Sequence, residues 1–177
     1  MKKILIPIAI IMSILVINVK EKEETYILPK DTIRLRIIAS SNTPYDQFIK
    51  IKVKENMEKV LENTISEEDD IETFRKTINE NLDKFENEVQ ETIDNYNYKK
   101  PFNIKYGYNY FPEKEYKGVK YEEGMYESLV VSLGEAKGDN WWCVLFPPLC
   151  MLEVEESEKD DIEYRFLVKD IVDKYIK

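Results

Sequence analysis

The sequence predicts an α+β domain in which two consecutive helices and a C-terminal helix pack on a small, mostly antiparallel sheet. Two patterns in the chain of 177 residues support this fold class. In short segments, apolar residues alternate with polar ones, which is typical of half-buried strands. In longer segments, apolar residues recur every three or four positions, which is typical of amphipathic helices. The predicted order is strand, helix, helix, strands and helix, so we expect the helices on one face of the sheet.

The N-terminus has the layout of an export signal. Met1 is followed by two lysines, residues 4–19 are uncharged and mostly apolar, and a charged stretch begins at Lys20. As a helix, the apolar run would span roughly 24 Å, which is less than the ~30 Å thickness of a hydrocarbon core. No pair of small residues marks a cleavage site after it. A cleaved signal peptide and a retained membrane anchor are therefore both open for this segment.

The chain accordingly divides into three parts. Residues 1–19 are the predicted signal peptide or N-terminal membrane anchor, residues 20–30 are a polar linker, and residues 31–177 form a single exported domain. A domain of about 150 residues buries roughly 68–70% of the surface of its unfolded chain, so it needs no metal in order to fold.

The first predicted strand covers residues 32–39. Its alternating residues are Ile33, Arg34, Leu35, Arg36 and Ile37. We expect the apolar side chains in the core and the two arginines on a solvated face of the sheet.

Two helices are predicted after this strand. The first covers residues 44–63, with Thr43 as its N-cap and Pro44 at its first position. The second begins at Ser66 and runs to about residue 95 as one continuous helix. Its apolar residues are Ile71, Phe74, Ile78, Leu82, Phe85, Val89 and Ile93. Their spacing corresponds to about 3.67 residues per turn, so we expect this helix to be nearly straight.

The C-terminal half predicts two longer strands and a closing helix. The strands cover residues 102–110 and 125–133, and Gly118 and Gly124 bracket a hairpin arm between them. Apolar positions at helical spacing predict the closing helix over residues 160–176.

The composition excludes several classes of function. The chain has no histidine, which rules out a Ser-His-Asp triad, a Cys-His dyad and a metal held by imidazole. Its two cysteines alone cannot complete a structural zinc site. With 35 acidic and 26 basic residues, the net charge is −9, and no basic stripe offers a surface to nucleic acid. We therefore predict no catalytic site built on histidine, no metal and no nucleic-acid partner.

Residues 134–150 differ from the rest of the chain. They contain both tryptophans and both cysteines, and Pro147-Pro148 disfavours a helix or a central strand, so we predict a loop from Cys143 to Cys150. In an exported protein, two cysteines that close a short loop most simply form a disulfide. A buried pair of free thiols and a reactive thiol are the alternatives. The preceding Gly134-x-x-x-Gly138 lacks the Lys-Ser/Thr of a phosphate loop and is interpreted as a hinge.

The run from Trp141 to Leu149 is too apolar for a solvated loop. It either fills the open end of the sheet as core or presents a docking surface. Tryptophan serves both purposes, so residue type does not decide between them.

Three segments resemble a known family. Residues 140–150, which read NWWCVLFPPLC, closely resemble the signature of the stage II sporulation protein R family. Residues 33–54 resemble the N-terminal block of that family, and residues 126–135 resemble the strand that precedes its signature. The resemblance thus covers about residues 31–151.

The resemblance implies an exported signalling protein of endospore formation, not an enzyme, with no catalytic residue and no cofactor. Members of this family act in the space between the forespore and mother-cell membranes, where they activate a membrane-embedded aspartic protease that cleaves pro-sigma-E. The implied partner is the extracytoplasmic face of that protease. The implied contact with the membrane is limited to residues 4–19, if the signal is retained.

On this reading, the signature loop contacts the partner. The candidate partner-binding residues are Trp141, Trp142, Phe146, Pro147 and Pro148, and the Cys143–Cys150 pair braces the loop. Arg34 and Arg36, on the outer face of the first strand, are weaker candidates.

An exported peptidoglycan-binding or peptidoglycan-hydrolysing domain is the competing hypothesis. Hydrolysis would need two facing carboxylates as acid and base. The acids near the aromatic segment are Glu122, Glu123, Glu127 and Glu135, and nothing in their spacing singles out a pair. A purely structural exported domain is a third possibility.

Overall fold

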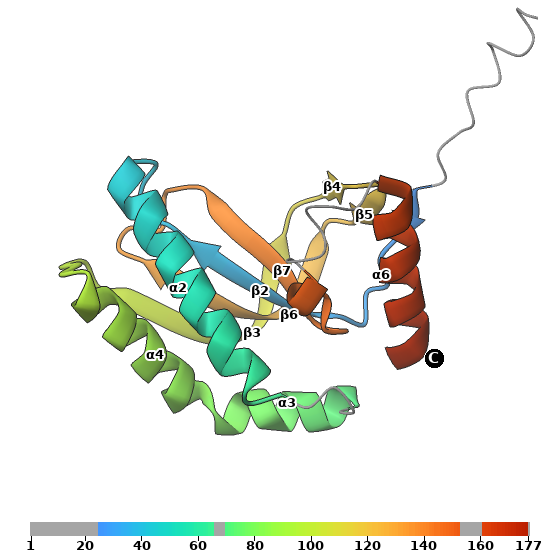
Figure 1. The fold of residues 1–177 in the computed structure, drawn as a ribbon, viewed down its shortest axis with the longest axis horizontal. Helices are drawn as coiled ribbons and strands as arrows, with labels where there is room; N and C mark the ends of the chain where they lie inside the picture. The colour runs from blue at the N-terminus through green and yellow to red at the C-terminus, as the bar shows by residue number, and fades with distance from the viewer. Residues whose placement is uncertain (1–24, 66–69, 153–160, 177) are drawn as a thin grey trace, which may run out of the picture.

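The computed structural model describes residues 25–65, 70–152 and 161–176, which form an α+β fold with two sheets (Figure 1). Its elements are β1 (Tyr26–Ile27), β2 (Ile33–Ile38), α2 (Pro44–Glu62), α3 (Ile71–Glu80), α4 (Leu82–Asn95), β3 (Phe102–Phe111), β4 (Lys114–Tyr116), β5 (Val119–Tyr121), β6 (Gly124–Leu133), β7 (Asn140–Phe146), η1 (Leu149–Leu152) and α6 (Asp161–Tyr175). The predicted signal or anchor at residues 1–19 lies outside the described residues. Within them, no helix combines the length and apolar character needed to span a bilayer.

The main sheet has the strand order β3-β6-β2-β7. The β3–β6 and β2–β7 pairs are antiparallel, whereas β2 and β6 run parallel. A smaller sheet has the order β1-β5-β4, in which the β4–β5 hairpin turns at Lys117 and Gly118. The predicted α+β class and its mostly antiparallel sheet are therefore confirmed.

Helices α2, α3 and α4 cover one face of the main sheet (Figure 1). Ile33, Leu35 and Ile37 of β2 are completely buried against this layer, as their alternation predicts. Helix α2 starts as predicted, because the Thr43 side chain accepts a hydrogen bond from the Asp46 backbone N–H and Pro44 occupies the first turn.

The prediction of one continuous second helix is wrong. Within the described residues, α3 begins after the N-cap Asp70, whereas the predicted start at Ser66 lies outside them. The helix breaks at Asn81, whose φ of −114° and ψ of 14° leave the helical region. The Asn81 side chain donates a 2.8 Å hydrogen bond to the Thr77 carbonyl, which is the local competition that disfavours asparagine inside helices. The apolar stripe continues across the break, so periodicity alone does not reveal it.

The closing helix α6 confirms the predicted segment but covers a different surface from α2 and α4. Figure 1 places it beside β4 and β5, on the opposite side of the molecule from α4. Tyr164 and Val168 of α6 pack with Leu28, Val119 and Val144 in a second buried cluster. The two arginines of β2 face this side, and Arg34 is only 2% exposed, so the prediction of a solvated face is wrong.

The predicted loop from Cys143 to Cys150 is also wrong in its first half. Strand β7 continues to Phe146 and pairs antiparallel with β2, with an irregularity in register between Ile33 and Arg34. The strand ends where Pro147 begins, because proline cannot donate to a sheet ladder. Two consecutive prolines are therefore compatible with a strand that stops just before them.

A buried polar network lies at the turn between β2 and α2. The Asp46 carboxylate accepts hydrogen bonds from Lys100 at 2.8 and 2.9 Å, from the Tyr98 hydroxyl at 3.0 Å, and from Ser41. Burial, together with the bond to Asp46, raises the pKa of Tyr98 to about 12. Lys100 also donates to Ser40 at 3.2 Å, so its ammonium group connects Ser40 to Asp46 of α2, while Ser41 bonds to Asp46 directly.

The same turn holds the loop that leads into β7. The backbone N–H groups of Lys137 and Gly138 donate to the carbonyls of Ser40 and Ala39 at 3.1 and 2.9 Å. The Asn42 side chain accepts a 2.6 Å hydrogen bond from the Asp139 backbone and donates a 3.2 Å one to its carboxylate. These bonds fix the point at which β7 begins.

Two glycines permit this close approach. Gly134 has a φ of +53°, in the left-handed region that favours glycine, and a Cβ there would collide with the Ser40 side chain. A Cβ at Gly138 would collide with the Ser41 carbonyl. The predicted hinge is therefore a closely packed loop.

Gly138→Ala should destabilise the domain by about 1–3 kcal/mol, because the loop must move away from backbone that cannot yield. The measurement is the free energy of unfolding in urea. Lys137→Ala is the matched control, since its exposed side chain forms only a surface ion pair with Glu135. If Gly138→Ala is as stable as the wild type, this account of the loop is contradicted.

The Asp46 network predicts a loss of stability in acid. Burial alone would raise the pKa of Asp46, but the hydrogen bonds from Lys100, Ser41 and Tyr98 outweigh burial and lower it from 3.8 to about 2. The folded state therefore binds this proton more weakly than the unfolded chain. The resulting stabilisation, about 2 kcal/mol, is complete above about pH 4 and is lost as the pH falls through about 2.

Urea unfolding of wild type and Asp46→Asn checks this expectation. The variant should be less stable by about 2 kcal/mol at neutral pH, and the two proteins should converge as the pH approaches about 2. Glu135→Gln, at an exposed ion pair, should follow the wild type at every pH. A difference between wild type and Asp46→Asn that does not change with pH would refute the proposed role of the carboxylate.

Candidate functional site

Strand β7 presents its two tryptophans on opposite faces of the main sheet. Trp141 lies on the helix side, where the Lys54 ammonium is 5.1 Å from its ring centroid. Trp142 lies on the other side, 4.4 Å from the Arg36 guanidinium and 5.0 Å from the Phe111 ring. Both indoles are half-buried, so each supports the sheet and still offers surface to a partner.

The remaining candidate residues differ in accessibility. Phe146 is 3% exposed and packs against the rings of Phe74 and Tyr175, at 5.5 and 5.7 Å between centroids. Pro147, which follows a cis peptide bond, is buried as well, whereas Pro148 is half-buried. The apolar run is therefore core at Phe146 and Pro147 and surface at Trp141, Trp142 and Pro148.

Cys143 and Cys150 are joined by a disulfide, as their spacing predicts. Cys143 lies in β7 and Cys150 in η1, with 5.6 Å between their Cα atoms. The bond ties the strand to the short helical turn that follows the prolines. It thereby holds the half-buried Pro148 in a fixed place relative to the tryptophans.

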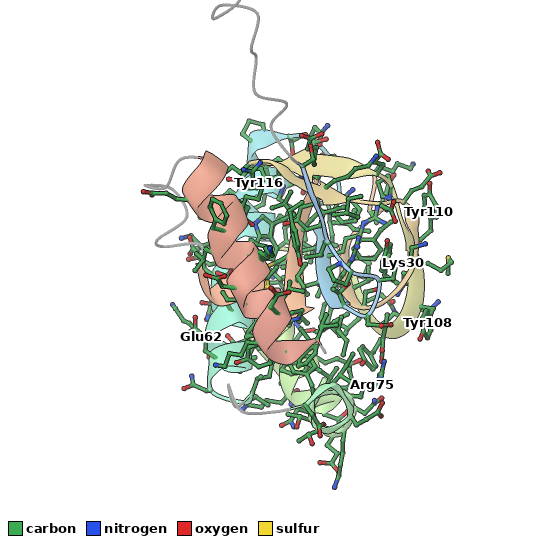
Figure 2. The ribbon with its side chains drawn as sticks, turned by 90° about the vertical axis from the view of Figure 1, so that its right-hand side faces the viewer. Lys30, Glu62, Arg75, Tyr108, Tyr110 and Tyr116 are labelled. Atoms are coloured by element: carbon green, nitrogen blue, oxygen red, sulfur yellow. A yellow bond between two sulfur atoms is a disulfide. The ribbon has the colours of Figure 1, made fainter. Side chains whose placement is uncertain are left out.

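A cavity of about 350 Å³ opens beside β7. It lies between this strand, the β4–β5 hairpin and α6, and aromatic rings from several elements line it: Phe111, Tyr116, Tyr121, Trp141, Trp142 and Tyr164. Figure 2 views the molecule from the α6 side and shows Tyr116 beside the upper end of that helix. The Tyr116 and Tyr164 rings meet edge to face at 5.7 Å. Sequence reasoning missed this cavity, because its walls come from segments far apart in the chain.

Arg34 lies at the base of the cavity. Its guanidinium is stacked 3.3 Å from the ring centroid of Tyr126, and Nε donates to the Thr32 hydroxyl at 3.4 Å. Burial lowers the pKa of Arg34, and burial also lowers the pKa of Arg36. Both side chains are nevertheless cations at neutral pH, because arginine starts from a pKa above 12. In the sequence, these two arginines could be noticed because they alternate with apolar residues in a predicted strand.

The structure does not bring the four candidate acids together as a catalytic pair. Glu127 accepts hydrogen bonds from the Tyr106 hydroxyl at 2.6 Å and from Arg75 at 2.8 Å, whereas Glu135 pairs with Lys137.

The other two acids have partners of their own. Glu123 accepts a hydrogen bond from Tyr110 at 3.0 Å, and Glu122 lies 4.0 Å from Lys30.

The cavity itself offers a single carboxylate among the described residues that line it. That residue is Glu113, which pairs with Lys120 at 2.9 Å. Hydrolysis of a glycosidic bond by two carboxylates has no counterpart in this arrangement. The described residues also contain no cluster of three or more acidic or cysteine side chains that could hold a metal ion.

Comparison with known proteins assigns the chain to a family. No solved structure matches it. It is 32% identical over 139 residues to "Stage II sporulation protein R" of Bacillus subtilis (strain 168), an alignment that covers 78% of this chain and 62% of that protein. The chain thus spans less than two thirds of the curated relative's length. The family model described as Stage II sporulation protein R (spore_II_R) matches residues 29–156, which include the polar network, strand β7 and most of the cavity wall. The chain therefore belongs to the Stage II sporulation protein R family.

Proposed function

We propose that this protein is an exported signal of endospore formation that activates a membrane-embedded aspartic protease by binding its extracytoplasmic face. The activated protease then cleaves pro-sigma-E in the mother cell. The protein acts in the space between the forespore and mother-cell membranes, either free or anchored by residues 4–19. It supplies binding energy and no chemistry of its own.

One observation carries this proposal: the family signature forms a strand whose tryptophans are half-buried beside an aromatic cavity. Tryptophan is among the residues that contribute most to protein–protein binding, especially where its ring is already packed on one side. The membership of the chain in a sporulation family supports the biological setting. The absence of paired carboxylates among the described cavity residues favours a ligand over a hydrolase.

Activation by binding requires that the protein prefer the active state of the protease. To move a two-state equilibrium from 1:99 to 99:1, a ligand must bind the favoured state more tightly by about 5.5 kcal/mol. A rigid surface is well suited to this task, because little conformational entropy is lost on binding. Strand β7 is rigid in this sense, since it is paired with β2 along its length and joined to η1 by the disulfide.

The activation test uses a non-sporulating bacterial host that co-expresses the protease and tagged pro-sigma-E. We expect cleavage with the full chain, but none when residues 2–19 are deleted and the protein stays in the cytoplasm. Trp141→Ala should reduce activation about tenfold or more, since loss of a binding hot spot costs roughly 2 kcal/mol. Immunoblotting of pro-sigma-E measures the result.

Tyr108→Ala is the matched control, because this exposed aromatic residue belongs to β3, at the opposite edge of the main sheet from β7, and points outward in Figure 2. It should activate like the wild type. If the folded, exported wild type gives no cleavage, the proposal is refuted. Binding of that protein to purified cell wall, with release of fragments, would instead favour the peptidoglycan hypothesis.

Removal of the disulfide by Cys143→Ala with Cys150→Ala should lower stability by about 2–3 kcal/mol, because the unfolded chain gains freedom when this short loop opens. For a domain of this size, the melting temperature should fall by roughly 4–10 °C. Reductant should lower the melting temperature of the wild type to that of the double variant and leave the variant unchanged. A wild type that does not respond to reductant would contradict the disulfide.

A further inference from the structure

The cavity runs along the free edge of strand β7. Five consecutive residues of this strand, 140–144, line it. Successive side chains of a strand point to opposite faces, so a cavity bordered by an unbroken run lies against the strand edge as well as one face. Among the described strands, β7 pairs with β2 alone. Its outer edge therefore offers backbone donors and acceptors to whatever enters the cavity.

At one end of the cavity, Arg34 is a buried cation that forms no ion pair with the carboxylates of the described residues. The side chain is 2% exposed, and its Nη2 atom has no hydrogen-bond partner among the described residues. Phe111, Tyr121 and Tyr126 surround the guanidinium with aromatic rings within 6 Å, and none of the described carboxylates forms an ion pair with it. Burial of an unpaired charge is costly, and a carboxylate from outside would remove that cost through paired N–H donors.

At the other end, Asn140 presents a second unsatisfied group. Its Oδ1 atom is buried and accepts no hydrogen bond from the described residues. Asn140 is paired with Ile38 and Val144 with Arg34, so the two unsatisfied groups lie four residues apart along β2. At about 3.3 Å per residue, this separation is roughly 13 Å. A ligand that satisfies both groups is therefore extended along the strand.

We propose that the cavity beside β7 is a docking groove for an extended acidic segment of a partner protein, which pairs with the free edge of β7 and places an Asp or Glu carboxylate on Arg34. Addition of a strand to a sheet edge is a common mode of peptide recognition, in which backbone bonds give affinity and side-chain sites give specificity. The aromatic rings of the groove would cover the apolar residues that flank the acid. This inference rests on the proposed function in that the partner is the protease that the protein activates.

Charge favours an acidic peptide over a neutral glycan as the occupant. Aromatic rings can bind either, but a glycan without a carboxylate leaves the Arg34 guanidinium unpaired. The groove also contains Lys114, and its acid Glu113 is already paired with Lys120. The charged side chains among the described lining residues are Arg34, Lys114 and Glu113, so an anion would meet a net positive charge from them, although the whole chain carries a charge of −9.

The test is a selection of peptides on the full-length chain, exported with a C-terminal affinity tag and immobilised. The probe is a phage-displayed library of random seven-residue peptides. We expect enriched peptides to share an Asp or Glu flanked by apolar residues. The affinity of each enriched peptide, made synthetically, is measured from the change in tryptophan fluorescence on binding, since the two tryptophans of the chain both line the groove.

Matched peptides and variants then isolate the carboxylate. Replacement of the acid by its amide in the peptide, or Arg34→Met in the protein, should weaken binding at least tenfold. Methionine keeps a long apolar side chain between the rings. Arg36→Met is the matched control, because Arg36 lies on the same strand face, stacks on Trp142 and does not line the groove. Should Arg34→Met fail to fold, Arg34→Lys replaces it, and this variant should weaken binding of the acidic peptide more than of its amide form, because lysine keeps the charge but not the paired N–H donors.

The outcomes separate this inference from the proposed function. Enrichment of peptides without an acid, equal binding by Arg34→Met, or Arg34-dependent binding of wall muropeptides alone would each overturn the inference. If the Arg34→Met variant activates the protease as well as the wild type does, the groove is not the binding site for the protease, and the proposed function still stands. If the wild type binds acidic peptides but does not activate the protease, the inference about the groove is supported and the proposed function is refuted.

Discussion

The pairing of β7 with β2 is the constraint on which the other features of the molecule depend. Because Ile37 lies opposite Trp141 and Arg36 opposite Trp142, this register sends one indole to the helix layer and the other to the aromatic side. The same pairing sets Arg34 beside Val144 and so defines the base of the cavity. The turn around Ser40 and the loop of residues 134–139 hold the start of β7, while the disulfide holds its end. Two strands that lie more than a hundred residues apart in the chain thus act as one unit.

The elements that could be predicted from sequence are those whose pattern is local. Strands β2, β3 and β6 follow from alternation, α2 from its cap and stripe, and α6 from helical spacing. The break at Asn81 could not be found this way, because the apolar stripe passes through it and only the side-chain hydrogen bond to Thr77 interrupts the helix. Strand β7 was hidden by the two prolines, which end the strand without excluding it.

The site was predictable in its residues but not in its shape. The disulfide was predicted from sequence and is confirmed, and Phe146 is core. Trp141, Trp142 and Pro148 keep accessible surface, and their contact with a partner stays a prediction. The burial of Arg34 could not be anticipated, because the rings that cover it come from the ends of β3, β5 and β6. Alternation identifies which residues share a face, yet it says nothing about what the rest of the chain lays over that face.

The close contact of Gly138 with Ser41 has a consequence for how loops of this protein can vary in length. Side chains of a strand alternate with a period of two, so a slip by one residue exchanges its faces. If the loop of residues 134–139 lost one residue, Trp142 would take the place of Trp141 against α2, and Cys143 would turn away from η1; the gain of one residue would exchange the faces as well, with Asn140 in the place of Trp141. Insertions and deletions in this loop are thus constrained to preserve parity, whereas its exposed side chains at Glu135 and Lys137 are free to change.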